Sequence, residues 1–274
     1  MESIPWQTIL FAFGLTLFAG LSTGIGSAMA FYSKKVDTRF LSGALGFSAG
    51  VMLYVSMIEI FPTAREAFTS VHGAEAAYWY TTLSFFGGIV LTALFDKLIP
   101  NPVGPPEIQK MDGIENQKET KDNRELMRMG VFVASALALH NFPDGLATFL
   151  SALENPTFGI SVALAIAIHN IPEGIAVSVP IYYATGNRRQ AFKYSFLSGM
   201  AEPLGAVIGF TLLRPFLSDT LFGVIFAGVA GVMVYISLDE LLPTAEKYAE
   251  HHIAIWGLIL GMAVMAISLL LLAE

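Results

Sequence analysis

The chain lacks cysteine entirely and carries few charged residues. The absence of cysteine excludes disulfides, thiolate metal sites and cysteine nucleophiles. Charged residues make up 14% of the 274 positions, and the net charge of −7 comes without a basic patch, so no nucleic acid is expected as a partner. Because 54% of the residues are hydrophobic, the composition excludes an ordinary soluble domain.

Long apolar runs fill most of the chain. Each has about the 20 residues that a helix needs to cross a bilayer. The eight runs are 6–32, 39–63, 78–99, 126–150, 157–183, 190–213, 219–243 and 252–272. The first is too long for a signal-peptide core, so we read it as a retained helix. We therefore predict an all-α membrane protein, with residues 1–274 forming one transmembrane transport domain in the lipid bilayer.

Basic residues indicate the orientation. Thirteen of the 15 lysines and arginines fall in or beside the loops after the first, third, fifth and seventh spans. The positive-inside rule places these loops in the cytoplasm and both termini on the opposite side. The longest of them, 101–124, is rich in proline and charge, and we predict a mobile cytoplasmic loop there.

Two distant segments repeat each other. Residues 49–64 and 230–245 are identical at ten of 16 positions, including a shared Glu and Pro-Thr-Ala in register. The segments lie on the second and seventh spans, which cross the membrane in opposite directions. Such a pair is typical of inverted-topology transporters, whose substrate sites lie near the bilayer midplane.

Two near-copies of one hexapeptide lie 29 residues apart, in the middle of the fourth and fifth spans: His140-Asn141-Phe142-Pro143-Asp144-Gly145 and His169-Asn170-Ile171-Pro172-Glu173-Gly174. In each copy the imidazole and the carboxylate are four residues apart and share a helix face, with the amide beside them. The glycines permit close approach of another helix. Ionisable groups at this depth are costly, which indicates function. The pattern predicts that metal ions bind inside the membrane.

Further candidate ligands lie on other spans. Glu202, followed by proline on the sixth span, falls at the same depth as the hexapeptides. Glu59 lies near the outer end of the second span, and Asp239 and Glu240 lie near the cytoplasmic end of the seventh. They suggest an entrance and an exit, and Met52 on the repeat is a weaker candidate.

Two other functions fit parts of this pattern. A metal-dependent intramembrane hydrolase needs a fixed ion with an open water position, but the His-Glu-x-x-His motif is absent. A passive channel could use the same residues, although the inverted repeat favours a carrier that opens alternately to each side. We therefore expect no enzyme activity and no resident cofactor besides the transported ion.

The paired hexapeptides, with Ala201-Glu202 and Asp239-Glu240-Leu241-Leu242-Pro243, resemble those of the ZIP family of divalent metal transporters, in particular its bacterial ZupT-type branch. The resemblance implies a 3+2+3 helix arrangement, inward transport across a bacterial cell membrane, and a homodimer. It also implies a binuclear site. The first ion would take His140, Asp144, His169 and Glu173, and the second would take Asn141, Asn170, Glu202 and the two shared carboxylates.

Two departures from the family pattern stand out. The first hexapeptide has Asp144 where Glu is usual, which retracts the carboxylate by about one bond and can change bridging or ion preference. The loop 101–124 has no histidine, so metal sensing through that loop is not expected. Imidazole, carboxylate and amide ligands without thiolate suit Zn(II), Fe(II), Mn(II) and Co(II) better than Cu(I), with Cd(II) a further candidate.

Overall fold

The computed structural model describes residues 5–30, 38–98, 114–213, 218–249 and 251–272, and all regular structure within them is helical. The elements are α1 (Trp6–Ala30), α2 (Thr38–Val55), η1 (Ser56–Ile60), α3 (Phe61–His72), α4 (Ala74–Leu98), α5 (Ile114–Glu154), α6 (Pro156–Thr185), α7 (Arg188–Gly199), α8 (Ala201–Ile208), η3 (Gly209–Leu213), α9 (Asp219–Tyr235), η5 (Ile236–Leu241), α10 (Leu242–Tyr248) and α11 (His251–Leu272). The three η elements are π-helical turns that continue the preceding helices.

Seven helical stretches within the described residues are long and apolar enough to cross a membrane. They correspond to seven of the eight predicted spans. The remaining span lies in α5, where His140, Asn141 and Asp144 lower the mean hydropathy. These same residues make that span a functional candidate.

The boundary of the predicted loop 101–124 needs correction. Residues 101–113 lie outside the described residues, but α5 begins at Ile114. The segment 114–124 is therefore helical rather than a loop. It contains neither glycine nor proline and is rich in glutamate and lysine, which favour helix.

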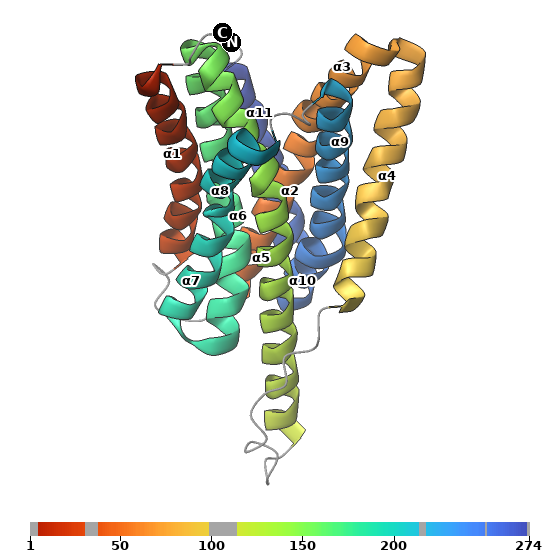
Figure 1. Cartoon of the computed structure of the whole chain (residues 1–274). Coiled ribbons are helices and arrows are strands. Elements are labelled where there is room, and N and C mark those ends of the chain that lie inside the picture. The colour runs from red at the N-terminus through yellow and green to blue at the C-terminus, as the bar shows by residue number, and fades with distance from the viewer. Residues whose placement is uncertain (1–4, 31–37, 99–113, 214–217, 250, 273–274) are drawn as a thin grey trace.

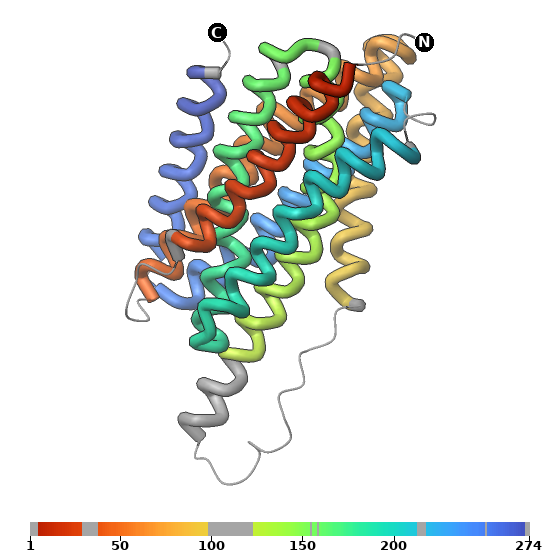
Figure 2. Tube along the Cα trace, turned by 60° about the vertical axis from the view of Figure 1, so that its left-hand side comes forward, coloured from red at the N-terminus to blue at the C-terminus, as the bar shows by residue number. Residues whose placement is uncertain are grey.

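The helices form two bundles that lie side by side (Figure 1). The site bundle consists of α1, α5, α6 and the α7–α8 pair, whose members pack against one another. The second bundle consists of α2 with η1 and α3, α4, α9 with η5 and α10, and α11. The beginning of α1 and the end of α11 lie on the same side of the molecule in both views (Figures 1 and 2), as an even number of crossings requires.

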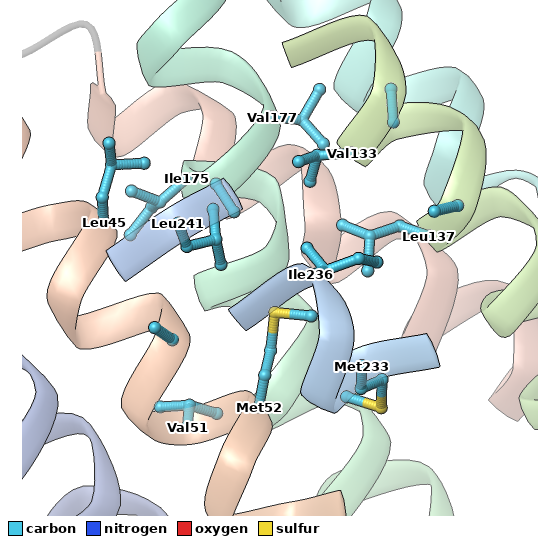
Figure 3. Packing of buried hydrophobic residues seen from close by; sticks show 14 of the residues in the cluster. Leu45, Val51, Met52, Val133, Leu137, Ile175, Val177, Met233, Ile236 and Leu241 are labelled. Carbon is cyan, nitrogen blue, oxygen red and sulfur yellow. The ribbon is translucent and has the colours of Figure 1, made fainter. Parts of the chain in front are cut away.

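A continuous hydrophobic core joins the two bundles (Figure 3). Leu45 and Met52 come from α2, Leu137 from α5, Val177 from α6, and Met233 from α9. Met52 and Met233 occupy equivalent positions of the sequence repeat, and both are fully buried. The repeat thus contributes matched side chains to the middle of the molecule.

The two repeat segments share a local irregularity. In each, a π-helical turn precedes a proline, at Ser56–Ile60 before Pro62 and at Ile236–Leu241 before Pro243. Proline removes one backbone donor and disfavours the preceding α-helical turn. A single π turn inside an α-helix is rare and is frequent at functional sites. Both turns carry the carboxylates that were predicted for the two mouths.

A buried hydrogen bond connects the two bundles at the second hexapeptide. Ser48 Oγ on α2 donates to the carbonyl oxygen of Pro172 on α6, at 2.8 Å. We expect Ser48→Ala to lower the unfolding free energy by about 1 kcal/mol, the usual net contribution of such a bond. Thermal unfolding in detergent measures this loss. Ser268→Ala is the matched control, because Ser268 bonds only within α11, to Val264. Equal melting temperatures for both variants would contradict the prediction.

Candidate metal centre

The two hexapeptides lie face to face where α5 packs against α6. All six of their candidate ligands are buried, with at most 4% of any residue exposed: His140, Asn141, Asp144, His169, Asn170 and Glu173. Both helices continue through their internal prolines. The predicted spacing therefore holds, and imidazole and carboxylate groups of the two helices contact each other.

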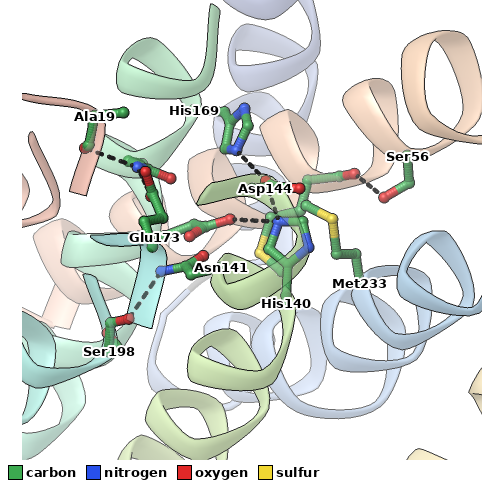
Figure 4. Close-up of polar contacts among 12 residues, drawn as sticks. Ala19, Ser56, His140, Asn141, Asp144, His169, Glu173, Ser198 and Met233 are labelled. Carbon is green, nitrogen blue, oxygen red and sulfur yellow. Dashed lines mark hydrogen bonds and ion pairs between the residues drawn. The ribbon is translucent and has the colours of Figure 1, made fainter. Parts of the chain in front are cut away.

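Four of these side chains form a tight cluster (Figure 4). Asp144 Oδ2 lies 3.2 Å from His140 Nε2 and 3.3 Å from His169 Nε2, so this one oxygen stands between both imidazoles. Glu173 Oε1 approaches His140 Nε2 from α6, at 3.4 Å. Ligand atoms of His140, His169 and Glu173 all lie within 4.8 Å of one another. The structure thus brings together the four residues expected around the first ion.

The two amides are oriented by backbone carbonyls of neighbouring helices. Asn141 Nδ2 donates to the carbonyl of Ser198 on α7, at 3.1 Å, and Asn170 Nδ2 donates to that of Ala19 on α1, at 2.9 Å. Asn170 Nδ2 also donates to Glu202 Oε1 on α8. The donor side of each amide is therefore occupied, and the oxygen Oδ1 is left as a candidate ligand.

Many polar atoms of this cluster are buried without a hydrogen-bond partner among the described residues. Besides the atoms of the imidazole–carboxylate contacts above, they are Nδ1 of His140, Oε2 of Glu173, Oε2 of Glu202, and Oδ1 of Asn141 and Asn170. Each unsatisfied buried group costs about 1–3 kcal/mol, and more when it is charged. A divalent cation would satisfy these atoms and offset the excess of carboxylates, so the chemistry of the donor set fits metal binding.

Glycines hold α1 closely against α6. A Cβ on Gly174 would lie 2.0 Å from the carbonyl oxygen of Thr23, and a Cβ on Gly26 would lie 1.9 Å from that of Ile171. Real Cβ atoms are not found at such distances. Only glycine lets the two backbones approach this closely, as the sequence predicted for Gly174.

The same contact recurs between α5 and α8. A Cβ on Gly145 would lie 2.0 Å from the carbonyl oxygen of Glu202, and a Cβ on Gly205 would lie 2.0 Å from that of Phe142. The two contacts match residue for residue, with Thr23 in the place of Glu202. Thr23 is fully buried and its hydroxyl has no hydrogen-bond partner among the described residues, and no sequence pattern predicted its position beside Gly174.

The residues predicted for the two mouths lie in different surroundings. Glu59 is exposed in the π turn of Ser56–Ile60. Asp239 is exposed and Glu240 is buried, and their carboxylates lie within 4.8 Å of that of Asp96 on α4. Met52 is fully buried in the core between the bundles, and its part in an entrance or exit stays a prediction.

Asp96 was not predicted because it lies outside the sequence repeats and near the end of its apolar run rather than in the middle. Its signal is an acidic residue just inside the end of an apolar run, next to Lys97. Arg128 was counted as a loop residue, yet it contacts Asp96 from α5. This contact has no signature in the local sequence, because it joins side chains that are 32 residues apart and on different helices.

Comparison with known proteins identifies related sequences. A family model described as "ZIP Zinc transporter" matches residues 103–269. The zinc transporter ZupT of Lysinibacillus sphaericus is 60% identical, over 96% of this chain and 98% of its own length. The zinc transporter ZupT of Oceanobacillus iheyensis is 59% identical, over 97% of this chain and 100% of its own length. That of Clostridium perfringens is 57% identical, over 97% of this chain and 97% of its own length.

Proposed function

Because this chain belongs to the ZIP zinc transporter family and is an integral membrane protein, we propose that it moves divalent metal ions across the membrane through the centre on α5 and α6. One observation carries the proposal. Imidazole and carboxylate groups from both hexapeptides converge at 3.2–3.4 Å in a buried site, where His140 Nδ1 and Glu173 Oε2 have no hydrogen-bond partner among the described residues. Zn(II) is the first candidate substrate, with Fe(II), Mn(II), Co(II) and Cd(II) as further candidates.

The first ion takes His140, Asp144, His169 and Glu173 as ligands. The buried cluster holds it away from water, and the close carboxylates supply the opposite charge that makes its dehydration tolerable. Asp144 is a short side chain that already lies between both imidazoles. We infer that it serves this first ion chiefly, while the longer Glu173 reaches both ions.

The second ion takes the amide oxygens of Asn141 and Asn170 with Glu202. Their orientation by the carbonyls of Ser198 and Ala19 supports this assignment. It also means that the second site depends on α1 and α7 as well as on α5 and α6. Glu202 exchanges its contact with Asn170 for the ion when the site fills.

Transport proceeds inward, from Glu59 through the centre toward Asp239 and Glu240, with both termini on the outside of a bacterial cell membrane. Matched glycine contacts and matched π turns support a 3+2+3 arrangement of inverted repeats. Such repeats favour a carrier whose site opens to one side at a time. A homodimer stays a prediction from the family resemblance.

Uptake of labelled Zn²⁺ into vesicles that contain the purified protein tests the proposal. We expect saturable uptake that other first-row divalent ions inhibit in competition. His169→Ala should reduce the rate at least about 100-fold, because it removes a direct ligand rather than a residue that only supports one. Full uptake by this variant would refute the assigned site, and flux that stays linear to high Zn²⁺ would indicate a channel.

A further inference from the structure

Arg128 lies inside the acidic cluster at the proposed cytoplasmic exit. Its Nη2 donates to Asp96 Oδ1 at 2.5 Å and to the carbonyl oxygen of the same residue at 3.0 Å. Its Nη1 lies 3.9 Å from Glu240 Oε1. The side chain of Arg128 is 24% exposed, and those of Asp96 and Glu240 are 19% and 11% exposed. The guanidinium thus occupies a half-buried place that a metal ion would also favour.

The contact joins the two bundles. Arg128 is on α5 of the site bundle, whereas Asp96 on α4 and Glu240 on η5 belong to the second bundle. Arg128 precedes His140 by 12 residues on the same helix. At 1.5 Å per residue, it lies about 18 Å from His140 along the axis of α5. Any movement of α5 relative to the second bundle must change this contact.

We propose that Arg128 is a positioning residue for ion release. Its guanidinium acts as a tethered cation that holds Asp96 and Glu240 while the exit is closed, and then competes with the departing ion for them. This inference rests on the proposed function and on its exit at Asp239 and Glu240. A departing ion displaces the guanidinium, and the returning guanidinium expels the ion into the cytoplasm.

The charges support this role. Asp96, Asp239 and Glu240 bring together three carboxylates whose ligand atoms lie within 4.8 Å of one another. Without an internal cation, such a group would retain a divalent ion and slow its release. Arginine suits the task because it is always charged and its planar fork binds carboxylates through more than one donor. It lowers the affinity of the cluster for metal without abolishing it.

A second ion pair at the same end provides a comparison. Lys247 on α10 donates to Glu125 on α5, at 2.7 Å, and it too joins the second bundle to the site bundle. Both side chains are largely exposed, at 38% and 58%, so the pair contributes little to stability. Because neither residue belongs to the acidic cluster, Lys247→Gln is a matched control for the loss of an ion pair between the bundles.

The test compares Arg128→Gln with Arg128→Lys in the full-length protein. Equilibrium dialysis in detergent counts bound Zn²⁺, and vesicle uptake separates the maximal rate from KM. We expect Arg128→Gln to bind one more ion per chain and to lower the maximal rate about tenfold, because removing a nearby positive charge strengthens cation binding. KM should not rise. Arg128→Lys and Lys247→Gln should keep the wild-type count and a rate within about threefold of it.

The double variant Asp96→Asn with Arg128→Gln removes both partners and should lose the extra ion. Arg128→Gln alone leaves the Asp96 carboxylate without its cation, and the double variant removes that negative charge as well. The double variant therefore controls for a folding defect caused by the unpaired carboxylate. A wild-type ion count in Arg128→Gln, or an extra ion in Arg128→Lys, would overturn the inference. If the wild-type protein takes up no metal, the proposed function fails, whereas the ion counts in detergent still decide whether Arg128 competes for the cluster.

Discussion

Glu173→Gln is expected to reduce Zn²⁺ uptake to the level of empty vesicles, a loss of at least about 100-fold. Glu173 is fully buried, its Oε1 lies 3.4 Å from His140 Nε2, and its Oε2 has no hydrogen-bond partner among the described residues. Glutamine keeps the size of the side chain and removes its charge. The packing of α6 is therefore preserved while the ligand is lost. Initial rates of uptake measure the effect.

Binding in detergent separates the loss of a ligand from misfolding. A ligand at 100 times its Kd stabilises a protein by about 2.7 kcal/mol, so Zn²⁺ should raise the melting temperature of the wild type. Glu173→Gln should fold, melt cooperatively without metal, and lose this increase. Glu66→Gln changes an exposed glutamate on α3 and should retain both binding and uptake. Wild-type uptake by Glu173→Gln would remove the basis of the assigned centre.

The core of the centre could be predicted because its determinants are local. A helix fixes which residues share a face, so the spacing of His140 and Asp144 placed them together before any packing was known. The internal similarity of the two hexapeptides then indicated that α5 and α6 face each other. The structure places the imidazoles and carboxylates of both motifs within 3.2–3.4 Å, as that reasoning required.

The supporting contacts could not be predicted in the same way. The carbonyls of Ala19 and Ser198 orient the two amides, and a backbone carbonyl has no sequence signature. Arg128 on α5 reaches Asp96 on α4 through its side chain, from 32 residues away in the sequence. Thr23 becomes visible as the counterpart of Glu202 only through the matched glycine contacts. Each depends on tertiary packing between segments that are distant in sequence.

The start of α5 shows a different limitation. Residues 114–124 are polar, and polarity suggested a loop. The structure continues the helix to Ile114, because the segment has no glycine or proline to stop it and contains good helix formers. Hydropathy identifies where a helix can enter lipid, but not where the helix itself begins.

Gly174→Ala is expected to have a large effect on folding, although it adds only one carbon. The new Cβ would lie 2.0 Å from the carbonyl oxygen of Thr23 and 3.1 Å from the backbone nitrogen of Ser27. Backbone atoms cannot swing aside as a flexible side chain can. The helix α1 must therefore move away from α6, and overpacking of this kind costs about 1–3 kcal/mol or more. Thermal unfolding in detergent measures the loss.

Gly14→Ala on α1 makes the same change where no atom lies within 4 Å of the new Cβ. There alanine should stabilise the helix by up to about 1 kcal/mol, so the two variants should shift the melting temperature in opposite directions. Displacement of α1 also withdraws the carbonyl of Ala19 from Asn170, so Gly174→Ala should weaken Zn²⁺ uptake even in the fraction that folds. A stable, fully active Gly174→Ala would show that α1 can separate from α6 without disturbing the centre. The orientation of Asn170 would then have to come from Glu202 instead.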